Sequence, residues 1–223
     1  MYPKMREWIT FGNHPRSHDV LKSGDLHSAL REFGFEQMME LRSGAAMKSD
    51  DPGVGFGVVL WLLGDYEGAG FAWAQITDAV FRGKYSHSNK KTFQAPLLLW
   101  FASVRLNCQD WHNLADRTFD KLLNKKYFAD TWPGVLAQLL QRKVDLTYVE
   151  SKFTEALRER QFPMAMFYAG VRAMENDDNE GALKYLDSVS EPLLEFWELE
   201  YYLAKYERAR LLKERSETQM AAS

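Results

Sequence analysis

The feature that most constrains the fold of this chain is a short polar break that recurs along it. Gly or Asn can end a helix in the left-handed conformation, and Asp can cap the free N–H groups of the next helix. Each break therefore predicts a tight turn between two antiparallel helices. The Asp residues of successive breaks lie 40, 45, 35 and 33 residues apart, a spacing typical of helical repeats. The breaks are Ser23-Gly24-Asp25, Leu63-Gly64-Asp65, Cys108-Gln109-Asp110, Lys143-Val144-Asp145 and Asn176-Asp177-Asp178.

Between the breaks, apolar residues fall at helical spacing. Phe196, Leu199, Leu203 and Tyr206, for example, form a stripe along one helical face. The sequence has no Asn-Gly or Asp-Gly hairpin turn and no convincing pair of strands. The chain is therefore expected to be all-α.

An internal alignment gives the five units a common register. A small or β-branched residue follows each break, and an aromatic or large aliphatic residue stands four positions later. These pairs are Ala29/Phe33, Ala69/Trp73, Ala115/Phe119, Val149/Phe153 and Ala182/Leu186. Twelve residues before each pair stands another small residue, namely Ser17, Gly57, Ser103, Ala137 or Gly170. We expect the small residue to let the two helices approach closely, and the large one to fill the space between neighbouring pairs.

This register resembles the tetratricopeptide repeat (TPR), a helix–turn–helix of 34 residues with a small residue on its first helix and A-x3-F on its second. Ala115, Val149 and Ala182 are spaced by 34 and 33 residues. The Trp of the repeat, and usually its Tyr, are replaced, so the repeats are degenerate and closest to bacterial ones. The resemblance implies an α-solenoid of about five TPR-like helical hairpins with a C-terminal capping helix. A single domain is expected over 1–215, with a disordered tail over 216–223.

Two regions depart from the repeat spacing. Extra residues separate the first two units around 43–49, and a polar insert over 84–95 separates the second and third. Loops of this length inside a compact array are functional or mobile. We therefore expect the insert to be mobile, or ordered only against a partner, and helix pairs to form over 50–83, 96–129, 130–162 and 163–196.

Charge, cysteine content and hydropathy narrow the class of protein. The net charge is −3, which disfavours nonspecific binding to nucleic acid or to an anionic membrane. The single cysteine, Cys108, fits a reducing compartment, and the N-terminus lacks the apolar stretch of a secretory signal. The longest apolar runs are near ten residues, too short to span a bilayer. A cytoplasmic location is expected, without nucleic-acid or membrane partners.

A search for catalytic or metal-binding motifs yields none. His14 and His18 stand at i, i+4, but Pro15 lies between them and no H-E-x-x-H pattern is present. The Gly53-x-Gly55-x-Gly57 run lacks the lysine of a phosphate loop and is interpreted as close helix packing. Cys108 has no catalytic signature around it and is interpreted as a buried small residue. We therefore expect no catalytic residue, metal or cofactor.

The TPR resemblance implies a binding groove on the concave face, which the first helices of the repeats line. Aromatic, Met and Arg side chains are also what protein interfaces concentrate. The alternative is that neighbouring helices cover these positions and make them core, in which case the partner surface lies on the insert or on the second helices. The groove residues expected from the resemblance are Val58, Trp61, Trp100, Val104, Gln138, Arg142, Phe167, Val171 and Met174.

The expected function is that of a non-enzymatic protein–protein interaction module, an adaptor or inhibitor that binds a partner protein or peptide. A narrower alternative is an immunity or antitoxin-type protein that neutralises a bacterial toxin. The rival class is an enzyme on a helical scaffold. A carboxylate or histidine with a strongly perturbed pKa in a cleft would favour the enzyme, and an open aromatic groove without one would favour binding.

Overall fold

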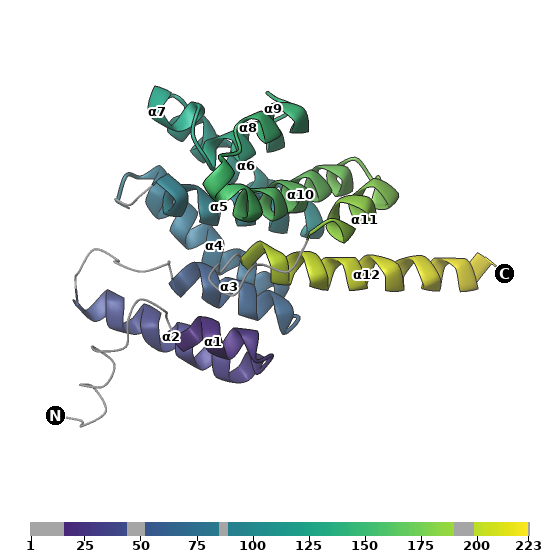
Figure 1. Ribbon diagram of the computed structural model, residues 1–223. Helices are drawn as coiled ribbons and strands as arrows, with labels where there is room; N and C mark the ends of the chain where they lie inside the picture. The colour runs from purple at the N-terminus through teal and green to yellow at the C-terminus, as the bar shows by residue number, and fades with distance from the viewer. Residues whose placement is uncertain (1–15, 44–51, 85–88, 190–198, 223) are drawn as a thin grey trace.

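The computed structural model describes residues 16–43, 52–84, 89–189 and 199–222 (Figure 1). Within these ranges every regular element is a helix and there is no strand, which confirms the all-α class. The elements are α1 (Arg16–Lys22), α2 (Leu26–Ser43), α3 (Pro52–Leu62), α4 (Tyr66–Phe81), α5 (Asn89–Leu106), α6 (Gln109–Leu123), α7 (Lys126–Ala129), α8 (Gly134–Leu140), α9 (Leu146–Ser151), the short 3-10 helix Glu155–Leu157, α10 (Arg158–Glu175), α11 (Asn179–Asp187) and α12 (Leu199–Ala222).

All five polar breaks are turns between consecutive helices. Each turn holds one residue with positive φ: Gly24 (82°), Gly64 (89°), Asn107 (50°), Arg142 (61°) and Asp177 (57°). Glycine takes this conformation without steric cost, whereas an arginine there is uncommon. In the fourth turn the left-handed residue is thus Arg142, just before the predicted Lys143-Val144-Asp145 segment.

The predicted Asp caps form at four of the five turns. Asp25, Asp65, Asp145 and Asp178 each accept a hydrogen bond from the backbone N–H three residues later, at 3.0, 2.9, 2.8 and 2.8 Å. The third turn differs, because Cys108 is the N-cap of α6 and makes no side-chain cap bond. Asp110 instead lies in the first turn of α6, where its charge complements the helix dipole.

The small-and-large register is confirmed in atomic detail. A Cβ added to Gly57 would lie 2.4 Å from the indole nitrogen of Trp73, and one added to Gly170 would lie 3.2 Å from Cδ2 of Leu186. Both large residues are buried, and the Trp73 indole N–H donates to the carbonyl of Val54 at 3.1 Å. In these two units, the small residue on the first helix therefore makes room for the large residue on the second.

Two first helices begin earlier than predicted and run through a proline. α5 contains Pro96 and α10 contains Pro163, although the sequence analysis started both helices at these residues. Proline costs an interior helix one hydrogen bond. In α5 the extension is anchored by Phe93, a fully buried residue whose ring centroid lies 6.4 Å from that of Phe119 and 5.6 Å from that of Phe128. Burial of this aromatic residue outweighs the local proline signal.

The expectation of a mobile insert over 84–95 is therefore wrong for its second half. Residues 89–95 belong to α5, and Thr92, Phe93, Gln94 and Ala95 are buried. The segment 85–88 lies outside the described residues. Although most residues of the insert are polar, the apolar side chain of Phe93 anchors its second half in the core.

The fourth unit is also irregular. A regular helix pair was expected over 130–162, but α8 and α9 have seven and six residues and are joined by a five-residue turn, and α10 already begins at Arg158. Val149 is buried at its predicted register position, and Phe153 packs partly buried against the core. The register thus survives although the helices are short.

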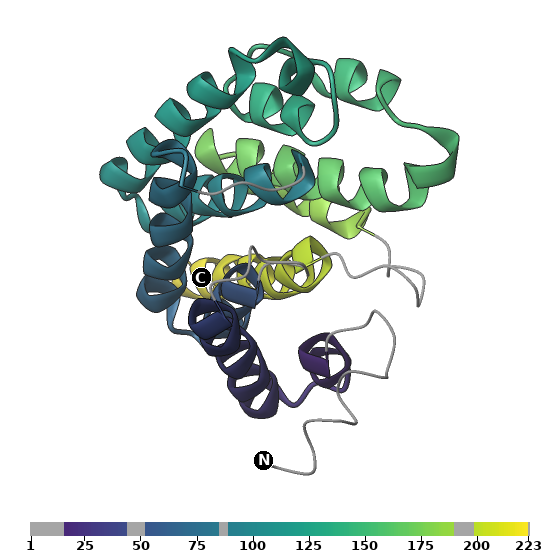
Figure 2. The same cartoon turned by 90° about the vertical axis from the view of Figure 1, so that its left-hand side faces the viewer.

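The C-terminal helix does not simply cap the end of the stack. α12 runs back along the chain and packs against α3, α10 and α11, and Figure 2 shows the other helices curving around it. It also continues to Ala222, so residues 216–222 are helical rather than a disordered tail. This segment has no Gly or Pro to end the helix, and Thr218 donates to the carbonyl of Glu214 one turn earlier, at 2.9 Å.

In the described ranges, no helix combines the length and the apolar character that crossing a bilayer requires.

Replacing the two register glycines with alanine tests this packing. Gly57→Ala is expected to lower the free energy of unfolding by about 1–3 kcal/mol, because Trp73 cannot retreat without losing its hydrogen bond to Val54. Gly170→Ala is the matched control, because the side-chain end of Leu186 can yield by a few tenths of an ångström. Alanine's higher helix propensity, about 0.5–1 kcal/mol, then offsets the contact. Urea unfolding of both variants makes the comparison, and equal stabilities would refute the assigned contacts.

Candidate functional site

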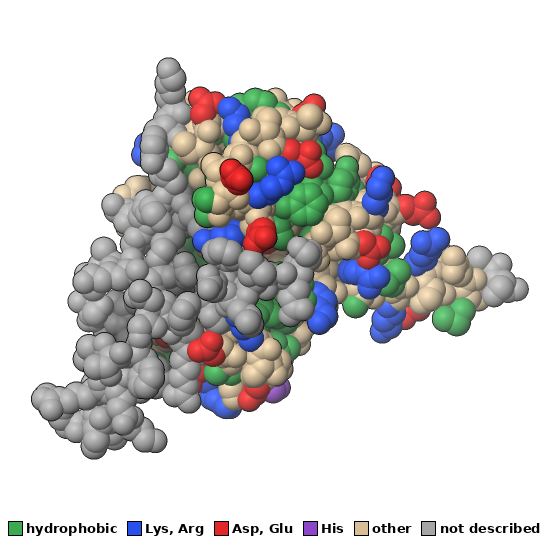
Figure 3. Space-filling model, viewed as in Figure 1, with side chains coloured by type: hydrophobic (Ala, Val, Ile, Leu, Met, Phe, Trp, Pro, Cys, Tyr) green, Lys and Arg blue, Asp and Glu red, His purple; other side chains and the backbone are tan. Residues whose placement is uncertain are grey.

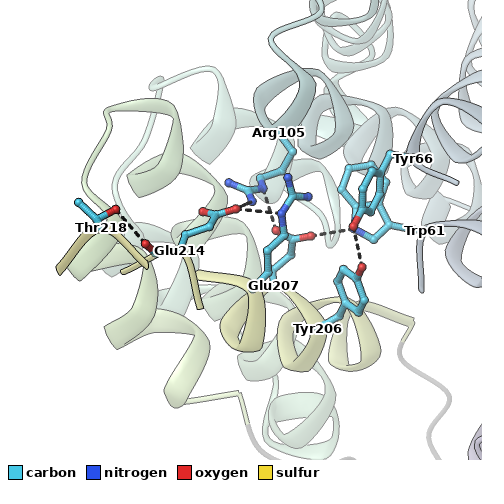
Figure 4. Close-up of polar contacts among 8 residues, drawn as sticks. Trp61, Tyr66, Arg105, Tyr206, Glu207, Glu214 and Thr218 are labelled. Carbon is cyan, nitrogen blue, oxygen red and sulfur yellow. Dashed lines mark hydrogen bonds and ion pairs between the residues drawn. The ribbon is translucent and has the colours of Figure 1, made fainter. Parts of the chain in front are cut away.

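A buried carboxylate on α12 lies at the centre of a polar cluster, on the inner side of the curve that the other helices form around α12. The side chain of Glu207 is fully buried; its Oε1 accepts a hydrogen bond from the indole N–H of Trp61 at 2.8 Å, and its Oε2 lies 2.7 Å from Nε of Arg105. Figure 4 shows these groups converging from α3, α5 and α12. Burial raises the pKa of the Glu207 carboxyl, and the Arg105 guanidinium opposes that rise without cancelling it.

The same cluster extends outward along α12. The hydroxyls of Tyr66 and Tyr206 are 2.6 Å apart, and burial together with the Tyr66 hydroxyl raises the pKa of Tyr206 to about 12. The guanidinium of Arg210 lies 4.9 Å above the Tyr66 ring and donates to Glu214 at 3.0 Å. Because the buried carboxylate at its centre faces partners on α3 and α5 rather than a cavity, this cluster fastens α12 to the body.

Six of the nine predicted groove residues are core residues. Val58, Trp61, Phe167 and Val171 are fully buried, and Trp100 and Met174 are exposed by only 3% and 7%. Val104 is half-buried against the same core. In the part of the chain that the structure describes, these side chains line no open groove. The core alternative therefore applies to them, because α12 and the neighbouring helices fill the space that an open concave face would leave.

The two polar residues predicted for the groove, one in α8 and one in the turn that follows it, take part in intramolecular contacts. Gln138 is half-buried and donates to the carbonyl of Ala129 at 2.5 Å. Arg142 is half-exposed and reaches the next turn, where it donates to Asn176 at 2.6 Å and pairs with Glu175 at 3.3 Å. Arg142 therefore ties two successive turns together.

A serine, a histidine and a carboxylate come together near these turns, without the geometry of a catalytic relay. Ser103 Oγ lies 3.4 Å from Nδ1 of His112, and Oε1 of Glu175 lies 3.9 Å from the same nitrogen. A relay needs the nucleophile and the acid on opposite ring nitrogens. Ser103 also donates to the carbonyl of Trp100 at 2.7 Å, within its own helix. We interpret this cluster as packing at the helix ends.

An open surface with aromatic side chains lies between α4 and α6, two second helices on the outside of the curve in Figure 2. A groove of about 770 Å³ runs between them, within the size range of ligand pockets. It is lined by Phe71, Ala74, Gln75, Asp78, Asp110, Trp111, Asn113, Leu114, Asp116 and Arg117. This is the surface that the sequence analysis named as an alternative to the concave groove.

Two aromatic rings and a glycine build one wall of the groove. Phe71 is 59% exposed, and its ring meets that of Trp111 edge to face, with centroids 5.5 Å apart and planes at 80°. The indole lies directly on Gly70, where an added Cβ would come within 2.1 Å of it. Trp111 is thus seated on the backbone of α4, and Phe71 presents an aromatic ring to solvent.

The sequence analysis missed Phe71 and Trp111, although a signal for one was present. Phe71 follows the core residue Ala69 by two positions, which on a helix points it to nearly the opposite side. An aromatic residue on the outward face of a second helix is unexpected in a purely structural repeat, and large exposed apolar side chains mark interaction sites when they cluster. The sequence around Trp111 did not indicate a surface role, because the position of its indole depends on packing against Gly70 of another helix.

The charge pattern elsewhere is mixed. On the face drawn in Figure 3, Lys and Arg side chains stand beside Asp and Glu, and the described part of that face shows no continuous basic stripe. Searches against protein-family models, curated proteins and solved structures find no match for this chain. The site is therefore argued from its own geometry.

Truncating a core aromatic residue and an exposed one should give opposite results. Trp100→Ala is expected to lower the free energy of unfolding by about 3–5 kcal/mol, the usual cost of removing a buried Trp or Phe side chain. Phe71→Ala should change it by less than about 1 kcal/mol, because most of that side chain is already in water. Chemical denaturation measures both. A stable Trp100→Ala variant would contradict the core position of this residue.

The raised pKa of Glu207 predicts how stability depends on pH. A carboxyl whose pKa is higher in the folded state favours folding most when it is protonated, below its ordinary value of 4.5, and that contribution is lost as pH rises through the folded-state pKa. Glu207→Gln does not titrate, so the wild type should lose stability relative to this variant as the pH rises above the ordinary carboxyl pKa of 4.5.

Denaturant unfolding of both proteins at each pH measures this difference. Glu217→Gln is the control, because the side chain of Glu217 is 60% exposed on the same helix and pairs with Lys213 rather than with Arg105. A relative gain by the wild type at higher pH would mean that the Arg105 ion pair outweighs burial.

Proposed function

We propose that this protein is a non-enzymatic interaction module that binds a segment of a partner protein in the groove between α4 and α6. The observation that carries the proposal is the exposed Phe71 ring beside Trp111 in a groove of about 770 Å³. Aromatic anchors in a partly enclosed groove are where binding energy concentrates in protein interfaces. Trp111 is fixed on Gly70, so part of the surface is formed before a partner arrives.

We further propose that the chain is an α-solenoid of degenerate TPR-like hairpins that works in a reducing compartment such as the cytoplasm. The turn geometry and the contacts of Gly57 with Trp73 and of Gly170 with Leu186 support the repeat interpretation. The single cysteine, Cys108, which is free, supports the compartment. In this arrangement the concave side holds α12, and the second helices present the partner-binding surface.

A peptide selection tests the proposed function. A displayed library of random peptides is selected on the wild-type protein, and the enriched peptides are synthesised for affinity measurement. Phe71→Ser should weaken their binding about 30-fold, because truncating an anchor residue costs about 2 kcal/mol or more.

Leu212→Ser on α12 is the matched control, since Leu212 is also a large exposed apolar residue, at 40%. It should bind as the wild type does. Peptides that bind both variants equally well would refute the α4–α6 groove as the site.

A further inference from the structure

The groove between α4 and α6 is acidic as well as aromatic. The carboxylates of Asp78, Asp110 and Asp116 line it, and among its described lining residues Arg117 is the only cation. A segment that enters the groove therefore meets an excess of negative charge next to the rings of Phe71 and Trp111.

The guanidinium of Arg117 already makes contacts with neighbouring groups of the protein. The Nε of Arg117 donates to the carbonyl of Asn113 at 3.2 Å, and its guanidinium lies 5.4 Å over the ring of Phe81. Its contacts thus hold it toward Phe81 and the backbone of α6. Arg117 therefore does not neutralise the carboxylates that line the groove.

The three carboxylates differ in the ion pairs and hydrogen bonds that they already form within the protein. The side chain of Asp110 is exposed and forms no ion pair or hydrogen bond with any residue in the described ranges. Asp78 pairs with Arg82 at 2.9 Å, in a contact whose two side chains are 40% and 59% exposed, so water competes for it. Asp116 accepts a hydrogen bond from the neutral side-chain amide of Gln141 at 2.7 Å.

We infer that the partner segment is basic, and that one of its arginines lies against Phe71 and Trp111 while meeting Asp110. This inference rests on the proposed function of the same groove. A guanidinium suits the site because it stacks on aromatic faces and pairs with a carboxylate through two parallel hydrogen bonds. An acidic segment, or the phosphates of a nucleic acid, would meet three carboxylates and be repelled.

The test uses the peptide selection on the wild-type protein and on the double variant Asp78→Asn/Asp110→Asn. Peptides enriched on the wild type should carry more arginine than the input library, and selection on the double variant should lose that enrichment. The affinity of a selected peptide should fall about tenfold on the double variant. It should also weaken as NaCl is raised from about 50 to about 500 mM, since exposed charge pairs are screened by salt.

Asp120→Asn/Asp130→Asn is the matched control, because it removes the same charge from residues outside the groove lining. It should bind as the wild type does. Peptides that depend on Phe71 but carry no excess of basic residues would overturn this inference and leave the proposed function standing. Peptides that ignore Phe71 overturn both. Self-association of the protein in sedimentation that Phe71→Ser abolishes would make a second copy the occupant, and would also overturn the inference.

Discussion

The ion pair between Glu207 and Arg105, with the indole of Trp61, sets the position of α12 and through it the shape of the molecule. Burying a carboxylate is costly, and a buried pair adds little net stability over apolar packing. Removing one partner leaves an uncompensated buried charge, at a cost of about 3–5 kcal/mol. Moving α12 by one residue would rotate Glu207 by about 100° away from Arg105 and Trp61 and incur the same cost. The cluster thus admits one register of this helix.

With α12 held inside the curve, the described parts of the first helices offer no open groove of the kind that a solenoid offers a ligand. Trp61, Phe167 and Val171 pack in the core, and the polar ends of α8 and α10 are joined by Arg142 and Glu175. The second helices face outward instead, and there the chain places Phe71 and Trp111. The contact that closes the inner side therefore leaves the outer side as the surface for the proposed binding.

Most of the fold could be predicted from local sequence rules. The predictions failed where contacts between residues distant in sequence determine the structure. The turns, the Asp caps and the small-to-large register depend on residues close in sequence, so they could be predicted. The position of α12 could not, because Trp61 and Glu207 are 146 residues apart. The proline rule misplaced the start of α5, because burial of Phe93 against Phe119 outweighs one lost hydrogen bond. The groove could not be predicted either, because it depends on the packing of Trp111 against Gly70. Residue spacing along the sequence does not reveal this contact between two helices.

The interior cluster and the outer groove contain similar chemical groups, and they differ in how far those groups are exposed to solvent. Inside, an arginine and a carboxylate pair beside an indole, and because the carboxylate is buried the pair fixes one geometry. In the groove, Asp110 and the ring of Phe71 are exposed, the ring of Trp111 is partly buried, and Arg117 is held toward Phe81. Supplying an arginine from a partner would complete a similar set of contacts, in a place where each stays reversible because water and salt compete. A weak, salt-sensitive and arginine-dependent interaction is what such a surface favours.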